Sequence, residues 1–326
     1  MSNEQIPVTI VTGFLGSGKT TLLNRILQEQ HGQRIAVIEN EFGEAGIDNE
    51  ILLQDSDQQI IEMNNGCICC TVRGDLVRIL GNLSDKRKSG ELKFDRVVIE
   101  TTGLADPAPV AQTFFVDDKI QENFLLDAVV TLVDAKHAPM QLKEHHEAQE
   151  QVGFADRILI SKSDLVSAQE TAALTERLRG LNPRAKIKQV NFGKTDIADI
   201  LDIRGFNLDD ILNIEPDFLA ENHHEHDDDI ASFVFRNKRP FLMDKLDTFL
   251  GGMLEIYGAD MLRYKGVLHV QGNASRVVFQ GVHMLMASDV GKPWLNDAER
   301  ESVLVFIGRN LPKEVFQAGL QTCLAK

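Results

Sequence analysis

Residues 13–20 read GFLGSGKT, and this glycine-rich stretch decides the fold of the chain. It follows residues 8–11, VTIV, an apolar run typical of a buried strand, and precedes residues 22–27, LLNRIL, with leucines and isoleucine at helical spacing. Glycines let backbone N–H groups wrap around an anion, and the start of a helix adds unpaired N–H groups and the positive end of its dipole. The pattern predicts a phosphate-binding P-loop, and its spacing differs from the G-x-G-x-x-G of dinucleotide-binding proteins.

Two further residue groups complete the expected phosphate site. Lys19 should reach the β- and γ-phosphates of a nucleotide, and the Thr20 hydroxyl should bind Mg²⁺. A second apolar run, residues 96–99, ends in Glu100, and Gly103 follows three positions later. Glu100 would hold Mg²⁺ through water or position the attacking water, and the backbone N–H of Gly103 would approach the γ-phosphate. The predicted catalytic residues are therefore Lys19, Glu100 and Gly103.

The identity of the base is indicated by residues 161–164, SKSD, which follow the apolar strand pattern of residues 157–160. This segment lies where the [NT]-K-x-D motif of GTPases would fall and departs from it at Ser161, in the first place, which puts the affinity for the base in question but not the fold. A carboxylate at Asp164 can accept hydrogen bonds from both N1–H and the 2-amino group of guanine, whereas adenine offers no such pair of donors. The stem of Lys162 would lie along the plane of the base. The motif favours GTP over ATP.

Residues 64–70 read NNGCICC and predict a metal site at the start of a helix, where the dipole favours thiolate. A disulfide between Cys69 and Cys70 is unfavourable, because adjacent Cα atoms lie about 3.8 Å apart and disulfides need at least about 4.4 Å. Three soft ligands in four residues, Cys67 included, suit an ion of the Zn²⁺ class.

The acidic loop at residues 39–44, ENEFGE, is the predicted second contributor to this metal site. Three thiolates leave a fourth position for Glu39, Glu44 or water. An alternative site would use fewer thiols and both carboxylates. A mobile loop that contacts Mg²⁺ is a further reading of the same carboxylates.

Composition limits the class of protein. The 326 residues carry a formal net charge of −15, which argues against non-specific binding to nucleic acid. No apolar run is as long as a membrane span, and the first residues lack the basic region of a signal peptide. We therefore expect a cytoplasmic protein with neither nucleic acid nor membrane as a partner.

The chain is expected to form two domains joined by a linker. Residues 1–205 should be the nucleotide-binding domain, and residues 230–326 a smaller α+β domain. The linker, residues 206–229, contains NHHEHDDD and has no apolar periodicity. It would act as a solvated hinge or as a low-affinity metal site. Within the first domain, residues 84–91 are predicted to be a polar surface loop.

Taken together, these motifs resemble the CobW-type family of P-loop GTPases, relatives of the urease and hydrogenase nickel-insertion GTPases. The resemblance rests on GFLGSGKT, ENEFGE, GCICC, VVIETTG and SKSD, and it extends to RYKG at 263–266 and FIG at 306–308. It implies an α/β fold with a doubly wound, mainly parallel sheet, followed by the α+β domain. It also implies a metallochaperone, with zinc the usual metal and cobalt or nickel suited to the same ligands.

The motifs and the resemblance together identify the expected site residues. The nucleotide contacts are Gly13, Phe14, Leu15, Gly16, Ser17, Gly18, Lys19, Thr20, Thr21, Glu100, Lys162 and Asp164. The transition-metal ligands are Cys67, Cys69 and Cys70 with Glu39 and Glu44, and the Mg²⁺ ligands are Thr20 and Glu100.

The expected function is a slow GTPase, cycling between GTP and GDP, that couples its nucleotide state to metal transfer to a client metalloprotein. The acidic loop and the cysteines lie between the P-loop and Glu100, where the switch segments of GTPases fall. No arginine finger is evident in the chain, which predicts slow intrinsic hydrolysis. Two other functions fit: a zinc buffer or sensor with nucleotide as a conformational ligand, and an ATP-dependent kinase or ligase. The oligomeric state is open, and a homodimer is one possibility.

Overall fold

The computed structural model describes residues 5–29, 32–39, 49–53, 60–63, 72–205, 230–294 and 299–326. Contacts between Cα atoms divide the chain into two compact units. The first comprises Met1–Glu176 and Ala185–Phe206, and the second comprises Arg177–Arg184 and Asn207–Lys326.

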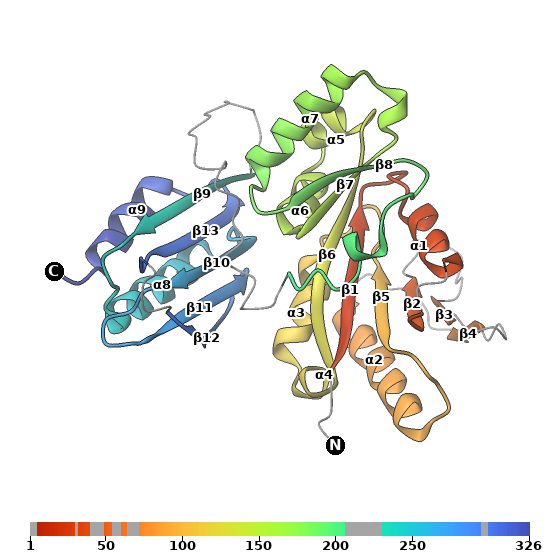
Figure 1. Cartoon of the computed structure of the whole chain (residues 1–326), viewed down its shortest axis with the longest axis horizontal. Helices are drawn as coiled ribbons and strands as arrows, with labels where there is room; N and C mark the ends of the chain where they lie inside the picture. Colours follow the sequence, from red (N-terminus) through yellow and green to blue (C-terminus); the bar gives the residue numbers. More distant parts are fainter. Residues whose placement is uncertain are drawn as a thin grey trace. The chain divides into compact units, whose positions relative to one another are not determined.

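The first unit is built on a mainly parallel sheet with the strand order β4-β3-β2-β5-β1-β6-β7-β8 (Figure 1). Strands β2, β5, β1, β6, β7 and β8 run parallel, and β3 and β4 extend the β2 edge as antiparallel strands. The strands are β1 (Ile6–Gly13), β2 (Ile35–Glu39), β3 (Asn49–Leu53), β4 (Ile60–Met63), β5 (Arg96–Glu100), β6 (Phe124–Asp134), β7 (Arg157–Ser161) and β8 (Lys186–Val190).

Helices cover both faces of this sheet. On one face, α1 packs on residues of β1, β2, β5, β6, β7 and β8, together with apolar residues between 197 and 203. The remaining helices include α2, α3 and α4, which pack together, and α6, which contacts β1 and β6. The helices are α1 (Lys19–Gln28), α2 (Val72–Ser89), α3 (Ala108–Val116), α4 (Asp118–Asn123), α5 (Ala138–Glu144), α6 (His146–Phe154) and α7 (Ala168–Leu181), with 3₁₀ turns η1 (Ser163–Leu165) and η2 (Ile197–Asp199).

The strand order indicates where a ligand would bind to this sheet. β1 lies between β5 and β6. The strands β5 and β2 lie on one side of β1, and the strands β6, β7 and β8 lie on the other. Ligands of such folds bind at the carboxyl ends of the strands where the winding reverses. The carboxyl end of β1 is Gly13, the first residue of the glycine-rich loop.

The second unit is a five-stranded antiparallel sheet, in the order β12-β11-β10-β13-β9, with two helices packed on one face (Figure 1). Phe233, Phe279, Phe306 and Phe316 belong to its aromatic core. Its elements are β9 (Ile230–Asn237), α8 (Met243–Tyr257), β10 (Arg263–Leu268), β11 (Ser275–Val282), β12 (Leu285–Pro293), β13 (Ser302–Arg309) and α9 (Lys313–Thr322).

The predicted fold class, a doubly wound and mainly parallel sheet followed by a smaller α+β unit, is confirmed. The prediction of a loop at residues 84–91 is wrong, because α2 continues to Ser89. Its Asp, Lys and Arg side chains lie on a solvated helical face, and lysine and arginine are good helix formers. The antiparallel strands β3 and β4 and the edge strand β12 were not predicted.

Candidate functional site

The glycine-rich loop joins the end of β1 to the first turn of α1. Gly13 has φ of 140°, and a Cβ there would lie 2.8 Å from the Ser17 hydroxyl oxygen. Gly18, the residue before the helix, has φ of 100°. Both values lie in a region that L-residues with a side chain avoid. These two glycines therefore let the backbone turn tightly at the mouth of the loop.

Lys19 folds back over this turn. Its Nζ donates to the Gly13 carbonyl at 2.8 Å and to the Phe14 carbonyl at 3.4 Å. Burial lowers the pKa of Lys19, and the negative charge of Glu100 partly opposes that shift. The ammonium group thus sits in the loop with two neutral acceptors, which an oxyanion of a phosphate would replace favourably.

Glu100 ends β5 beside the start of α1. The Thr20 hydroxyl donates to the Glu100 carboxylate at 3.4 Å. The next residue, Thr101, is anchored on β1 through its backbone N–H to the Val11 carbonyl (3.0 Å) and its hydroxyl to that of Thr12 (2.8 Å). A hydroxyl and a carboxylate side by side form the kind of hard-oxygen pair that Mg²⁺ takes in nucleotide sites.

The loop after β5 lies against the glycine-rich loop. A Cβ added to Gly103 would be 2.7 Å from the backbone nitrogen of Leu15 and 2.8 Å from its Cα. Among the described residues, the hydroxyls of Ser17 and Thr102 are buried without a hydrogen-bond partner. Buried polar atoms are normally satisfied, so these two hydroxyls have hydrogen-bonding capacity for a water or a polar ligand.

The SKSD segment follows β7 and reaches the glycine-rich loop from the other side. Lys162 adopts a left-handed backbone, with φ of 55°, and its Nζ donates to the Gly16 carbonyl at 2.7 Å. The Ser161 hydroxyl donates to the Ser17 carbonyl at 2.7 Å, so serine serves as a hydrogen-bonding residue in this first position. Asp164 lies in η1 with its side chain exposed.

Asp134, at the end of β6, holds Lys162 and was not singled out by the sequence analysis. Lys162 Nζ donates to Asp134 Oδ2 at 2.6 Å, and His137 Nδ1 lies 2.9 Å from the same oxygen. Asp134 Oδ1 accepts from the backbone N–H groups of Lys136 and His137. Burial alone would raise the pKa of Asp134, but the hydrogen bonds from Lys162, His137 and the backbone bring it below its ordinary value.

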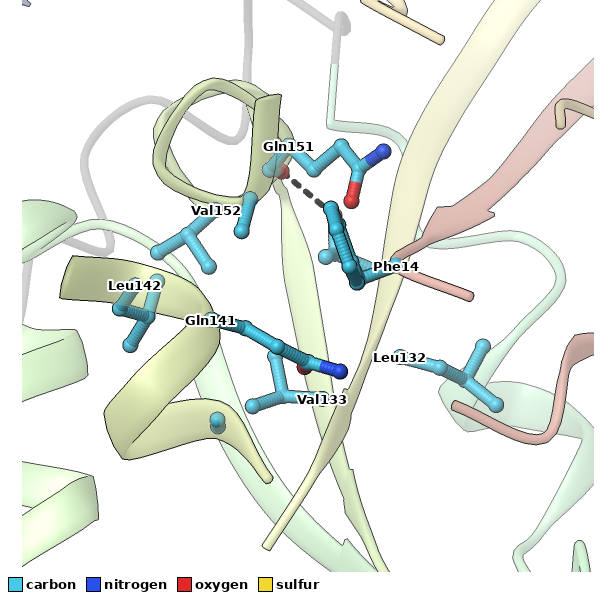
Figure 2. Close-up of a pocket in the computed structure, with 10 residues that line it drawn as sticks. Phe14, Leu132, Val133, Gln141, Leu142, Gln151 and Val152 are labelled. Carbon is cyan, nitrogen blue, oxygen red and sulfur yellow. Dashed lines mark hydrogen bonds between the residues drawn. The ribbon is translucent and has the colours of Figure 1, made fainter. Parts of the chain in front are cut away.

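The Phe14 side chain lines a pocket together with residues of β6, α5 and α6 (Figure 2). Its ring centroid lies 4.7 Å from that of His145, which precedes α6. Leu132, Gln141 and Gln151 are among the other residues that line the pocket. The glycine-rich loop is thus fixed at its second residue by an apolar contact with the α5–α6 pair.

The structure brings the predicted nucleotide residues into one region, at the carboxyl ends of β1, β5 and β7. The predicted metal ligands Cys67, Cys69, Cys70 and Glu44 lie outside the described residues, as does the linker 206–229. Glu39 ends β2, where its backbone aligns with that of Glu100 on β5.

Within the described part of the chain, no group of three or more His, Cys, Asp or Glu residues could hold a metal ion. The fourth cysteine, Cys323, is buried in the second unit, and burial raises its thiol pKa. In the same residues, no helix is long and apolar enough to cross a membrane.

Two family models match the chain, one for each part. The CobW/HypB/UreG nucleotide-binding domain matches residues 7–189. The cobalamin synthesis protein cobW C-terminal domain matches residues 230–324.

The similarity to known proteins extends over nearly the whole chain. The zinc chaperone YjiA of Escherichia coli (strain K12) is 43% identical over 316 residues, covering 96% of this chain and 97% of YjiA. The zinc-regulated GTPase metalloprotein activator 1 of Schizosaccharomyces pombe is 31% identical, covering 94% of this chain and 83% of that protein. The crystal structure of the Zn(II)-bound YjiA GTPase from E. coli superposes with a TM-score of 0.81, at 37% identity, over 99% of this chain and 100% of that one. The chain therefore belongs to the CobW/HypB/UreG family of GTPases and carries a CobW C-terminal domain.

Proposed function

We propose that this chain is a GTP-hydrolysing metallochaperone that binds zinc and couples its nucleotide state to metal transfer to a client protein. The observation that carries the nucleotide part is the meeting of Lys19, Thr20, Glu100 and Gly103 at the end of β1, with Lys162 arriving from β7. The names of the similar proteins, a zinc chaperone and a zinc-regulated GTPase activator, support the metal part.

In the proposed mechanism, Lys19 leaves the Gly13 and Phe14 carbonyls and pairs with the β- and γ-phosphates of GTP. Thr20 and Glu100 would hold Mg²⁺, which neutralises charge on the phosphates. The Gly103 N–H faces the γ-phosphate, and the orphan hydroxyls of Ser17 and Thr102 gain partners. Intrinsic hydrolysis is expected to be slow, because the mechanism includes no arginine finger from this chain.

The base is read by Asp164, whose exposed carboxylate is available to accept from guanine. Replacing Asp164 with asparagine keeps the size of the side chain and removes one of the two acceptors. We expect Asp164→Asn to weaken GTP binding at least about tenfold and to narrow the preference for GTP over ATP. A preference for ATP that is unchanged in the variant would instead favour a kinase or ligase.

The metal is bound by Cys67, Cys69 and Cys70, with Glu39 or Glu44 completing the site. Because these residues lie between the P-loop and Glu100 in the sequence, metal and γ-phosphate act on one switch region. Reciprocal coupling follows: a metal that changes nucleotide affinity must have its own affinity changed by the same factor. Zinc is proposed from the thiolate ligands and the relatives' names, and cobalt or nickel would use the same donors.

The test measures GTP turnover with and without Zn²⁺ in the wild type, in Cys69→Ala and in the control Cys323→Ala. Cys323 is buried among the core residues of the second unit, so its replacement removes a thiol that is not one of the proposed metal ligands. We expect Zn²⁺ to change the rate in the wild type and the control, and not in Cys69→Ala. An equal response in all three proteins would reject coupling through Cys69. Zinc binding without any turnover would favour a zinc buffer or sensor.

A further inference from the structure

Gln151, on α6, makes hydrogen bonds that the nucleotide motifs do not account for. Its side chain is buried, and its Nε2 donates to the Gly103 carbonyl and to the Ala105 carbonyl, both at 3.1 Å. Both partners are acceptors only, so the amide nitrogen must face them, and the orientation of the amide is fixed by its surroundings. One side chain thus satisfies two carbonyls of the loop that follows Glu100.

The position of Gln151 is itself firmly held. Its backbone carbonyl accepts a hydrogen bond from the Thr131 hydroxyl of β6 at 2.7 Å, which the dashed line in Figure 2 marks. The same figure shows Gln151 and Phe14 lining one pocket. The helix that carries Gln151 therefore contacts the glycine-rich loop through Phe14 and the following loop through the amide.

The loop at residues 103–105 is consequently held from two sides. Gly103 lies against the backbone of Leu15 on one side, and the carbonyls of Gly103 and Ala105 face Gln151 on the other. With these two carbonyls fixed, the peptide units around Gly103 have little freedom to rotate. Without the amide donor, the buried Gly103 carbonyl and the partly buried Ala105 carbonyl would both lose this partner, and the loop would move to find others.

We propose that Gln151 is a positioning residue for GTP hydrolysis, which holds residues 103–105 where the Gly103 N–H meets the γ-phosphate. The inference rests on the proposed nucleotide site and adds to it the residue that sets the γ-phosphate contact. Gln151 does not touch the nucleotide. GDP lacks the γ-phosphate, so its binding does not depend on the placement of this loop.

The experiment compares Gln151→Met with Gln149→Met. Methionine keeps the length of the side chain and removes the donor. Gln149 is the matched control, because it is buried on the same helix and its Nε2 donates to a backbone carbonyl, that of Leu142 at 2.7 Å, which lies in α5. The dissociation constants of GDP and of GTPγS are measured with fluorescent analogues in the presence of Mg²⁺, together with kcat for GTP.

For Gln151→Met we expect about tenfold weaker GTPγS binding and about tenfold lower kcat, with GDP binding within about twofold of the wild type. Gln149→Met should leave all three quantities near the wild-type values. An equal change in GDP and GTPγS affinity, or the same selective loss in Gln149→Met, would overturn the proposal and leave Gln151 a packing residue.

A second variant and a second control keep the result unambiguous. Should Gln151→Met fail to fold, Gln151→Glu has the same size and presents an acceptor to the two carbonyls, and the same selective loss is expected in it. Lys19→Ala tests the nucleotide site separately from the role of Gln151. This variant should abolish binding of both GDP and GTPγS. A wild-type chain that binds neither nucleotide would overturn the nucleotide site and the role of Gln151 together. Normal nucleotide binding by the wild-type chain, together with wild-type GTPγS affinity and kcat in the Gln151 variants, would overturn only the role of Gln151.

Discussion

Replacing Lys162 with methionine should weaken both the fold and nucleotide binding, because Lys162 joins two parts of the site. Its ammonium group donates to the Gly16 carbonyl at 2.7 Å and to Asp134 at 2.6 Å. The methionine side chain keeps the apolar stem and removes the charge. The change therefore tests the two polar contacts and leaves the packing of the stem in place.

The expected loss of unfolding free energy follows from these contacts. Hydrogen bonds to charged groups contribute about 1.5–3 kcal/mol each. The Lys162 side chain is 37% exposed, so solvent screening reduces this figure. Asp134 also keeps its bonds from His137 and from two backbone N–H groups, so it is not left without partners. We expect a total loss of about 1–2 kcal/mol at pH 7.

The pH dependence supplies a second check. The pKa of Asp134 is lowered in the folded protein, so its interactions add stability above the unfolded pKa and lose it as the pH falls through the folded pKa. Lys162 is one cause of that low pKa. The stability difference between wild type and variant should therefore be present at pH 7 and shrink below about pH 4.

The assay is urea denaturation followed by circular dichroism, from pH 7 downward, together with a titration of GDP. Lys136→Met is the matched control, because it removes the same charge from an exposed side chain and leaves the backbone N–H that bonds to Asp134. We expect GDP affinity to fall at least about tenfold in Lys162→Met and to stay unchanged in the control. Equal unfolding free energies for the two variants, with equal GDP affinities, would refute the reasoning.

Three further variants probe the rest of the first unit. Lys19→Ala should retain the fold by circular dichroism and lose GDP and GTP binding in fluorescence titration; retained binding would contradict the proposed phosphate contact. Gly103→Ala should lose most GTP turnover while GDP affinity persists, because the new Cβ would lie 2.7 Å from the Leu15 nitrogen; wild-type turnover would show that the two loops separate freely. Asp127→Ala should destabilise the chain by about 3 kcal/mol in urea denaturation, because it leaves the buried Arg96 guanidinium without its 3.1 Å partner; a change under about 1 kcal/mol would mean that other acceptors compensate.

Much of the first unit could be predicted from the sequence, because its central strands β1, β5 and β6 are buried on both faces and read as largely apolar runs. Residues of β1 such as Val8, Ile10 and Val11 are fully buried, and the same pattern recurs in β5 and β6. The glycine-rich loop and Glu100 are local signals at the ends of such runs. Because these strands are parallel, their carboxyl ends lie at the same edge of the sheet, which brings the glycine-rich loop and Glu100 together.

The strands that escaped prediction are the edge strands β4 and β12 and the strand β3 beside β4. β12 is largely exposed and contains Ser288, Asp289 and Gly291, so it lacks an apolar run. β3 and β4 are short and each contains a glutamate. In such strands the backbone pairing with neighbouring strands decides the structure, and composition carries little of that information.

The residues of the site that escaped prediction act across long separations in sequence. Asp134 holds Lys162 from 28 residues away, and Gln151 holds Gly103 from 48 residues away. Both are single polar residues in otherwise ordinary strand and helix patterns, with no spacing that indicates their partners. Only the sheet order, which brings the ends of β6 and β7 next to β1 and β5, makes them neighbours.

The bond from Lys162 to Gly16 has a consequence for biosynthesis. It connects positions 146 residues apart, so a nascent chain must extend through β7 before the segment proposed to read the base can lie beside the loop proposed to receive the phosphates. Until that length has left the ribosome, the proposed GTP site is incomplete, and ligands stabilise only the state that binds them. Lys19, bonded to the carbonyls of its own loop, needs no nucleotide during that interval. With the proposed function, full stabilisation by nucleotide would be gained only after about half of the polypeptide has been made.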